Sequence, residues 1–523
     1  MSILRGRPMV NVGHIATSAR PSTRTTIQSA TRVSAGFPRL ISLDLRNPGP
    51  KKERVVILGS GWAGYGFART LDPKKYETVM ISPRSYFVFT PLLAGTSVGT
   101  LEFRATIESV RRLGLDDFHQ GWADDVDFSK KVIRVEANTS GDLASRTRPP
   151  SGDSSAIQAK KGEVFDVPYD RLVIAVGSYS QTFGIEGVRE YANFLRDVSD
   201  ARKIRLRVLQ CFEKAALPTT TDEERKKLLH FAIVGGGPTG IEFAAELHDL
   251  INEDLVKMYP EIIKFVAITV YDVAPKVLPM FDQTLANYAM DLFHREGIQV
   301  KTKHHLTRIR PDTETEGCVK LKIRECGDEE VNAGIVVWST GLMQNPLIQK
   351  LADKVFPPNS AVTGDAKAAV KVQLQKDAKS GSILTDKHLR VSVVSAKTKE
   401  GQTITGKSIL PDVYAIGDCA IIDGQSLPAT AQVASQKATF LAKKFNKDDV
   451  HSLGFKFRNL GTMTYLGNWK AIHQSEADDL KGWAAWVLWR TAYLTKSMSI
   501  RNKIMVPIYW CISWLFGRDI SRF

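Results

Sequence analysis

The sequence predicts an α/β fold that contains two similar strand–turn–helix units and ends in a region of short amphipathic helices. Three observations lead to this prediction. A glycine-rich turn of the pattern GxGxxG follows the short apolar run Arg54–Leu58, and a second such turn follows Phe231–Val234. Near the C-terminus, residues 482–516 hold five of the nine tryptophans, interleaved with basic residues.

Length and cysteine usage argue against several classes of protein. At 523 residues the chain is long enough for several domains and a large core. It has no run of 18 or more uncharged apolar residues, which argues against a spanning helix and a multi-helix transporter. The five cysteines form no CxxC pair, so a disulfide scaffold, a zinc ribbon and a redox-dithiol enzyme are poorly supported. The histidines show no metal-site spacing either, so we expect no bound metal.

The net charge of +15 lies mostly at the two ends of the chain. Residues 1–46 and 481–523 each carry +6, which leaves +3 for the 434 residues between them. Because the body is nearly neutral, nucleic acid is not an expected partner. Residues 1–45 are rich in arginine and serine and hold one acid, which predicts a mitochondrial targeting segment; a basic arm that stays on the mature protein is the alternative.

The first unit opens with an apolar strand and a tight turn. Gly59, Gly61 and Gly64 occupy the three glycine positions of the pattern. In a Rossmann-like unit the first glycine permits the turn, the second lets the backbone approach a pyrophosphate, and the third lets the helix pack on the strand. The next strand, Thr78–Ile81, ends in the tripeptide 82–84 (SPR), where an acidic residue is usual.

The second unit repeats this arrangement. Gly235, Gly237 and Gly240 hold the glycine positions, and the following strand, Val266–Val270, leads to Asp272. A carboxylate at that strand end accepts hydrogen bonds from ribose hydroxyls and repels a 2′-phosphate, which favours NADH over NADPH. A single turn of this kind can serve packing alone. Two complete units about 175 residues apart indicate two dinucleotide sites.

Three later segments indicate how the units are connected. Tyr169–Ser178 and Val336–Gly341 each have the form of a strand that returns from one nucleotide domain to its neighbour. Val413–Ile416 is a strand that runs into Gly417 and Asp418, where a carboxylate can hold a bound polyol, and a long helix follows to about Phe445. The layout resembles the two-dinucleotide-binding-domain flavoproteins, whose N-terminal unit and late Gly-Asp segment hold FAD and whose inserted central unit holds NAD(P)H.

Four stretches narrow this resemblance. They are Ile81–Thr100 (ISPRSYFVFTPLLAGTSVGT), Gln181–Asp197 (QTFGIEGVREYANFLRD), Ala415–Ala420 (AIGDCA) and Pro428–Gln436 (PATAQVASQ). Together they are similar to the type II, or alternative, NADH:quinone oxidoreductases of mitochondria. The resemblance runs from about Arg54 to the C-terminus, and fungal members likewise carry SPR in place of the acidic residue.

The resemblance implies a role for each candidate site residue. The residues toward FAD would be Gly59, Gly61, Trp62, Gly64, Ser82, Arg84, Thr90, Pro91 and Asp418. Those toward NADH would be Gly235, Gly237, Gly240, Glu242, Asp272 and Gly341, with Glu242 on the nicotinamide side. Gln432 and Gln436 would be the catalytic pair beside the flavin, because an amide can donate or accept toward carbonyl oxygens without adding charge.

The activity that the resemblance implies is that of a rotenone-insensitive, non-proton-pumping NADH:ubiquinone oxidoreductase. NADH would pass a hydride to N5 of non-covalently bound FAD, and the reduced flavin would give two electrons to ubiquinone. An alternative is a flavoprotein of the apoptosis-inducing-factor type that acts mainly through partner association. Sulfide:quinone oxidoreductase would need redox cysteines beside the flavin, and Cys419 is better interpreted as a small buried filler.

The tryptophan-rich end predicts how the chain meets a lipid-soluble quinone. Trp483, Trp486 and Trp489 recur every three residues, and the apolar run Ile504–Phe516 is too short to cross a bilayer. We expect an interfacial anchor on an anionic membrane surface; a buried helical hairpin or a dimer interface is the alternative. The resemblance also implies a homodimer and a peripheral place on the mitochondrial inner membrane. The N-terminal segment contains no hydrophobic stop, which favours the matrix side over the intermembrane-space side.

These observations divide the chain as follows. Residues 50–225 and 342–450 would form a discontinuous FAD-binding domain, 226–341 the NADH-binding domain, and 451–523 the membrane-anchoring region. Residues 137–163 and 357–408 are polar, small-residue-rich insertions to which no chemistry is assigned.

Overall fold

Strand β1 (Glu53–Leu58) lies inside a parallel sheet, between β2 (Tyr76–Ser82) and β8 (Arg171–Ile174). Its last four residues, VVIL, are buried, as expected of a parallel strand covered on both faces. The computed structural model describes residues 52–138, 162–357, 371–395, 407–449, 453–476 and 478–522. The expected targeting segment 1–45 lies outside these residues, as do 139–161 of the first insertion and 358–370 and 396–406 of the second.

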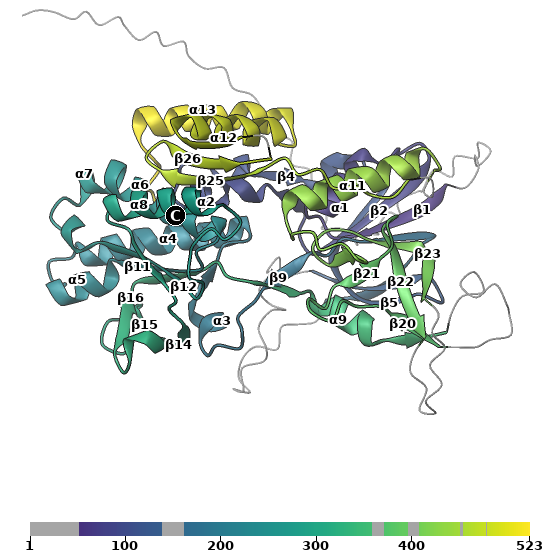
Figure 1. Cartoon of the computed structure of the whole chain (residues 1–523), viewed down its shortest axis with the longest axis horizontal. Helices are drawn as coiled ribbons and strands as arrows, with labels where there is room; N and C mark the ends of the chain where they lie inside the picture. The colour runs from purple at the N-terminus through teal and green to yellow at the C-terminus, as the bar shows by residue number, and fades with distance from the viewer. Residues whose placement is uncertain are drawn as a thin grey trace, which may run out of the picture. The chain divides into compact units, whose positions relative to one another are not determined.

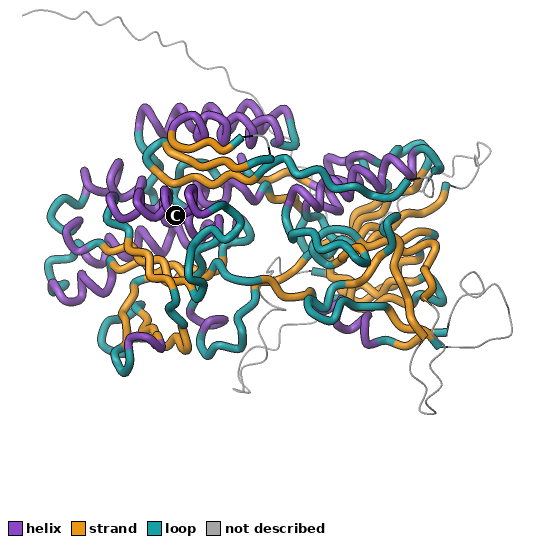
Figure 2. Tube along the Cα trace, viewed as in Figure 1, coloured by secondary structure: helices purple, strands orange, loops and turns teal. Residues whose placement is uncertain are grey.

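The first sheet continues on both sides of this centre (Figures 1 and 2). Its order is β19 (Val355–Phe356), β20 (Val372–Leu374), β22 (Arg390–Ser395), β23 (Lys407–Ala415), β8, β1, β2, β5 (Asp117–Asp127), β6 (Val132–Ala137) and β7 (Val164–Pro168). The strands from β23 to β5 are parallel, and the outer ones are antiparallel. Helices α1 (Trp62–Thr70) and α11 (Ala431–Asn446) pack against each other, and β21 (Ile383–Thr385) pairs with β24 (Ala420–Ile422).

The second sheet is wholly parallel. Its order is β10 (Asn193–Phe194), β17 (Ile335–Trp338), β11 (His230–Val234), β12 (Ala267–Asp272) and β13 (Gln299–Thr302). It is accompanied by α4 (Val198–Ala215), α5 (Asp222–Leu228), α6 (Pro238–Leu250), α8 (Gln283–Arg295) and the antiparallel strands β14 (Leu306–Pro311), β15 (Val319–Ile323) and β16 (Glu330–Ala333). Because β10 already pairs here, the second sheet begins earlier in the chain than the expected division at residue 226.

Two antiparallel strands connect the sheets. β9 (Ser178–Ser180) pairs with β18 (Leu342–Gln344), and Figure 1 shows β9 between the two sheet regions. The indole Nε1 of Trp338 donates a 2.9 Å hydrogen bond to the carbonyl of Gln181. The two predicted return segments lead into β8 and β17 of different sheets, and the chain pairs where each segment ends. Of the remaining elements, β3 (Tyr86–Val88) pairs with β4 (Ile107–Ser109), and α2 (Leu93–Ser97) packs against α4 and α6. Helix α3 (Val188–Tyr191) packs against β14, and α9 (Pro346–Asp353) packs against β5 and β20.

The C-terminal region contains a small antiparallel sheet as well as helices. Strands β25 (Thr462–Gly467), β26 (Lys470–Gln474) and β27 (Asp479–Gly482) form the sheet, which the sequence did not predict. Helices α12 (Trp483–Lys496) and α13 (Ile500–Phe516) follow, and they are the two expected short helices. β25 packs against α6 of the second unit, and α12 packs on β26 (Figure 1). Within the part of the chain that the structure describes, no helix is long and apolar enough to cross a bilayer.

Candidate functional site

The first glycine turn has the geometry of a phosphate cradle. Gly59 has a φ of +104°, and a Cβ there would lie 2.4 Å from the carbonyl oxygen of Ala175. A Cβ on Gly64 would lie 1.9 Å from the Gly59 carbonyl oxygen. A Cβ on Gly61 would meet no described atom within 4 Å. The outer glycines are thus needed for packing, and the middle one faces open space at the N-terminus of α1, where a pyrophosphate can approach.

Trp62 joins this turn to the segment that contains Thr90 and Pro91. Its indole Nε1 donates a 3.0 Å hydrogen bond to Oγ1 of Thr90, and its ring packs edge-on against Phe87 with centroids 5.1 Å apart. Pro91 stands in the single helical turn Thr90–Leu92, where its fixed φ is tolerated. The structure therefore brings together two predicted residues, Trp62 and Thr90, that lie 28 positions apart in the sequence.

Ser82 and Arg84 both have protein partners. The hydroxyl of Ser82 lies 2.8 Å from that of Ser60, within the cradle. Arg84 donates a 2.5 Å bond to the carboxylate of Asp197, which also accepts one of 2.9 Å from the Tyr86 hydroxyl. Burial opposes ionisation of Asp197, but the nearby Arg84 charge and these donors outweigh it and hold its pKa below the usual value. Arg84 thereby ties the first unit to the N-terminus of α4.

Asp418 lies beside an arginine that was not predicted from the sequence. Ser178 donates a 3.2 Å bond to the Asp418 carboxylate, and Nη2 of Arg196 donates to Ser178 at 3.4 Å. Nη1 of Arg196 is buried without a described partner. Burial lowers the pKa of Arg196, partly offset by the charge of Asp418. An unsatisfied buried donor next to a carboxylate fits a ligand that carries both phosphate and hydroxyl groups, as a dinucleotide does. Arg196 belongs to the quoted stretch NFLRD, so a sequence signal for it existed.

The second glycine turn repeats the cradle. Gly235 has a φ of +116°, and a Cβ on Gly237 would meet no described atom within 4 Å. The carboxylate of Asp272 accepts hydrogen bonds from the backbone N–H of Gly236 and, at 2.7 Å, of Ala274. Asp272 therefore shapes the turn as well as standing at the strand end. Gly341, with a φ of +28°, lies at the connecting strands, where its carbonyl accepts a 3.1 Å bond from Gln181.

Glu242 is buried on the side of α6 that faces the C-terminal region. Its carboxylate accepts hydrogen bonds from the backbone N–H of Tyr465 at 3.2 Å and from Nε1 of Trp489 at 3.3 Å. Burial raises the pKa of Glu242 to about 8. One helical turn further on, Glu246 accepts a 2.8 Å bond from the hydroxyl of Thr100 in the first unit. The two sheet units and the C-terminal region thus meet at one face of α6.

The two predicted glutamines are held by backbone groups. Oε1 of Gln436 accepts a 3.0 Å bond from the N–H of Arg458, and its Nε2 donates 2.8 Å to the carbonyl of the same residue. Gln432 bonds in the same way to Leu460 and Gly461, at 3.2 and 3.3 Å. Both amides therefore fix segment 458–461, through which the chain enters the C-terminal region. Their predicted contact with a quinone stays a prediction.

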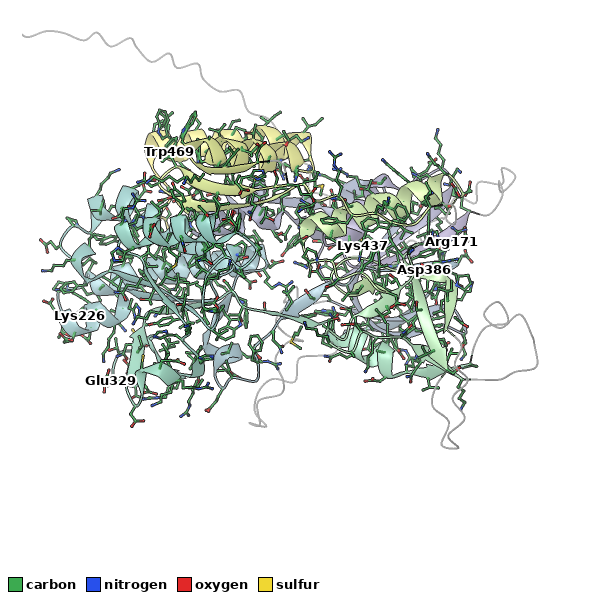
Figure 3. The ribbon with its side chains drawn as sticks, viewed as in Figure 1. Arg171, Lys226, Glu329, Asp386, Lys437 and Trp469 are labelled. Atoms are coloured by element: carbon green, nitrogen blue, oxygen red, sulfur yellow. The ribbon has the colours of Figure 1, made fainter. Side chains whose placement is uncertain are left out.

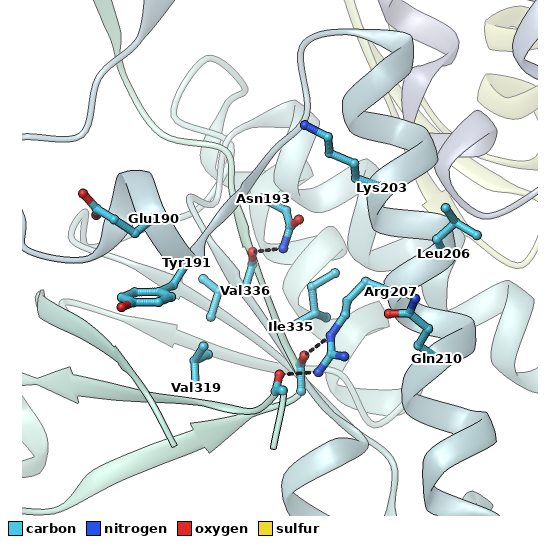
Figure 4. Close-up of a pocket in the computed structure, with 12 residues that line it drawn as sticks. Glu190, Tyr191, Asn193, Lys203, Leu206, Arg207, Gln210, Val319, Ile335 and Val336 are labelled. Atoms are coloured by element: carbon cyan, nitrogen blue, oxygen red, sulfur yellow. Dashed lines mark hydrogen bonds between the residues drawn. The ribbon is translucent and has the colours of Figure 1, made fainter. Parts of the chain in front are cut away.

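Cys419 and a hollow beside the second sheet are two further features, and neither contains any of the predicted site residues. Cys419 is buried, and burial raises the pKa of its thiol to about 11, in keeping with a filler residue. A hollow of about 440 Å³ lies between α3, α4 and the second sheet (Figure 4), and the residues that line it include none of the predicted ones. Arg207 spans its floor and donates to the carbonyls of Gly334, at 2.9 Å, and Gly317. In the described residues no cluster of three or more metal-ligating side chains occurs.

Comparison with known proteins agrees with this geometry. Residues 53–438 match the pyridine nucleotide-disulphide oxidoreductase family, and residues 459–519 match the NDH2 C-terminal domain. A probable NADH dehydrogenase of Dictyostelium discoideum is 37% identical over 481 residues, covering 90% of this chain and 92% of the relative. An external alternative NAD(P)H-ubiquinone oxidoreductase B3 of Arabidopsis thaliana is 33% identical, covering 90% and 91%.

Solved structures give the same result. The structure of NDH2 from Plasmodium falciparum in complex with NADH aligns with a TM-score of 0.72 at 26% identity, covering 90% of this chain and all of that one. The sulfide:quinone oxidoreductase of Aquifex aeolicus, at 16% identity and a TM-score of 0.58, shares the fold. The chain belongs to the pyridine nucleotide-disulphide oxidoreductases and, within them, to the type II NADH:quinone oxidoreductases, the FAD-dependent NADH dehydrogenases that do not pump protons.

Proposed function

We propose that this protein oxidises NADH and reduces ubiquinone at a mitochondrial membrane surface. The observation that carries the proposal is the meeting of three parts at α6, where Trp489 of the C-terminal region bonds to Glu242 and Thr100 of the first unit bonds to Glu246. A flavoprotein that acts mainly through partner association would not need this C-terminal region, which matches the NDH2 C-terminal domain. The match therefore favours the oxidoreductase over the apoptosis-inducing-factor alternative.

The residues of the first unit would hold FAD, which supplies the carrier of two electrons between NADH and quinone. Gly61 leaves the space for the pyrophosphate, while Arg196 and Asp418 offer a donor and an acceptor to phosphate and ribityl oxygens. In the second unit, Gly237 and Asp272 would hold NADH in the same way. Glu242 would lie on the nicotinamide side of that site.

Gln432 and Gln436 would help to position the quinone, because they hold segment 458–461 in place. Each amide uses one donor and one acceptor on segment 458–461 and keeps one N–H and one lone-pair site in reserve. This arrangement supports a positioning role, in which the amides fix the chain beside the flavin while a free N–H is directed to a carbonyl oxygen of the acceptor.

Helix α13 supports contact with a membrane because its apolar face points outward. Four isoleucines spaced by four residues are exposed, from Ile500 (78%) and Ile504 (56%) to Ile508 (44%) and Ile512 (43%). The opposite side is held by polar bonds: Nδ2 of Asn502 donates to Glu108 at 2.8 Å. A surface helix normally shows the reverse pattern, so this face fits the interface between lipid headgroups and acyl chains. Trp514, Leu515 and Phe516 extend it.

Cys511 offers a direct test of membrane contact. It is exposed on α13, Cys326 is partly buried, and the other cysteines are buried. In a Cys326→Ser background, a polarity-sensitive fluorophore on Cys511 should shift to the blue with vesicles that contain anionic lipid. The double variant Ile504→Glu, Ile508→Glu should lose the shift and keep its melting temperature. An unchanged spectrum with the parent protein would contradict membrane contact.

The finer location and the oligomeric state belong to the same proposal. The arginine-rich segment 1–45 supports a mitochondrial address, and we place the protein on the inner membrane, peripherally and facing the matrix. Protease added to intact mitochondria should leave it uncut; cleavage before rupture of the inner membrane would contradict the matrix side.

The exposed rings of Trp469 (41%) and Trp483 (65%) support pairing of two copies through the C-terminal region. Sedimentation in detergent should give twice the chain mass, and the chain mass alone would contradict the dimer.

The enzymatic proposal is tested with purified protein in detergent. We expect NADH oxidation that depends on a short-chain ubiquinone, while sulfide in place of NADH should give no quinone reduction. Quinone reduction by sulfide, or NADH oxidation that proceeds only with oxygen, would contradict it.

A further inference from the structure

Lys437 is a buried lysine on α11 with little to compensate its charge. Figure 3 labels Lys437. The residue is 2% exposed, and its Nζ donates a 3.1 Å hydrogen bond to the carbonyl of Ala420. Among the described residues no carboxylate forms an ion pair with it. A lysine ammonium has three donors, and burying it without a partner costs several kcal/mol in general. Such a residue persists where its charge or its donors serve a ligand.

The position of Lys437 indicates which ligand its charge would serve. Ala420 opens β24, two residues after Asp418, the predicted ribityl contact. Lys437 also lies one residue after Gln436, and the next residue, Ala438, packs against Gly66 of α1. The ammonium therefore lies behind the turn that presents Asp418, among the elements that form the FAD site. Burial lowers the pKa of Lys437, and the nearby Cys419 and Asp418 partly offset this effect.

We propose that Lys437 provides a buried positive charge that stabilises reduced FAD over oxidised FAD and so raises the flavin's reduction potential. Transfer of a hydride from NADH moves two electrons and one proton, and it leaves one negative charge on the flavin until a further proton arrives from water. A cation held in a low-dielectric interior interacts with that charge far more strongly than one in water. The exposed Lys443 of the same helix lacks this advantage. The inference rests on FAD binding alone and not on the identity of the electron acceptor.

Three variants test the proposal. Lys437→Met removes the charge and keeps the length of the side chain, and Lys437→Arg keeps the charge. Lys443→Gln removes an exposed lysine from the same helix as a matched control. The flavin midpoint potential is measured anaerobically against a reference dye, with a chemical reductant and without NADH or quinone. We expect Lys437→Met to lower the preference for reduced over oxidised FAD about tenfold, and the other two variants to stay near the parent value.

Loss of FAD from Lys437→Met would not remove the test. The variant is then titrated with oxidised FAD and, separately, with reduced FAD. The ratio of the two dissociation constants gives the same potential shift by linkage. An unchanged midpoint potential, an unchanged ratio, or an equal shift in Lys443→Gln would overturn the proposal. Because quinone is absent, failure of ubiquinone reduction would leave this result unaffected.

Discussion

The indole Nε1 of Trp489 donates a 3.3 Å hydrogen bond to the buried carboxylate of Glu242. This bond joins α12 of the C-terminal region to α6 of the second unit. The same helix carries Glu246, which accepts a hydrogen bond from Thr100 of the first unit. The region that meets the membrane in our proposal is therefore attached directly to the helix that follows the second glycine turn, rather than connected by a free linker.

Glu242 should make stability fall as pH rises. Burial raises its pKa from 4.5 to about 8, so the folded protein holds a proton that the unfolded chain has released. This stabilisation is fully present below about pH 4.5 and is lost as pH rises through about 8. Compared with the parent, Glu242→Gln should gain up to about 1.4 kcal/mol per pH unit within that window. Urea unfolding at pH 6, 7 and 8 measures the difference. A pH-independent difference, like that expected for the exposed Glu261→Gln, would refute this prediction.

Two glycines of the first turn should respond differently to alanine. In Gly59→Ala the new Cβ meets the Ala175 carbonyl and the φ of +104° is strained, so we expect a loss of about 2 kcal/mol or more in stability. In Gly61→Ala nothing in the protein opposes the methyl group, so the fold should survive while FAD is lost. Thermal melting and the flavin content of the purified proteins distinguish the two. A Gly61→Ala variant with full flavin content would be inconsistent with the cradle.

Gln436 should hold the entry to the C-terminal region closed to protease. Gln436→Ala removes two hydrogen bonds to Arg458 and should cost about 1–2 kcal/mol. Trypsin cleaves after arginine, so limited digestion should cut at Arg458 faster in this variant than in the neighbouring control Ser435→Ala. Equal cleavage rates would show that the amide does not hold the segment. Catalytically, we expect a raised KM for quinone with little change in flavin reduction by NADH.

Replacing Asp197 should lower the stability of the protein more than replacing an ordinary helix cap does. It caps α4 and also accepts bonds from Arg84 and Tyr86 of the first unit. Asp197→Ala should destabilise the protein by about 2–4 kcal/mol, because it leaves Arg84 without its carboxylate partner as well as removing the cap. Thr221→Ala, at the exposed cap of α5, should cost about 1 kcal/mol. Similar losses in the two variants, measured by urea unfolding, would argue against the inter-unit pair.

The sequence predicted those parts of the fold that depend on local backbone requirements. Gly59 and Gly235 stand at positive φ between strand and helix, as their patterns indicate, and the helix that follows Thr430 begins as expected. Such features are determined by the few residues around them in the sequence. The entry of the chain into the second sheet at β10 was missed, because a two-residue strand such as Asn193–Phe194 has no periodicity to detect.

The partners of individual side chains were less predictable. The spacing of Trp483, Trp486 and Trp489 contributed to the prediction of an interfacial anchor, yet Trp489 is buried and bonded to Glu242, while Trp483 is 65% exposed. Spacing by three residues rotates steadily around a helix, so the three rings point in different directions. The pairing of Arg84 with Asp197 and the burial of Lys437 likewise depend on contacts between distant segments, which one sequence does not reveal.

The central claim is that one protein accepts electrons from NADH and passes them to quinone at the place where its three parts meet. Anaerobic stopped-flow absorbance of the flavin in the detergent-purified protein tests it most directly. The account predicts that NADH bleaches the flavin and that a short-chain ubiquinone, added next, restores the oxidised spectrum within one turnover. A flavin that is bleached by NADH and stays reduced in the presence of ubiquinone would contradict it.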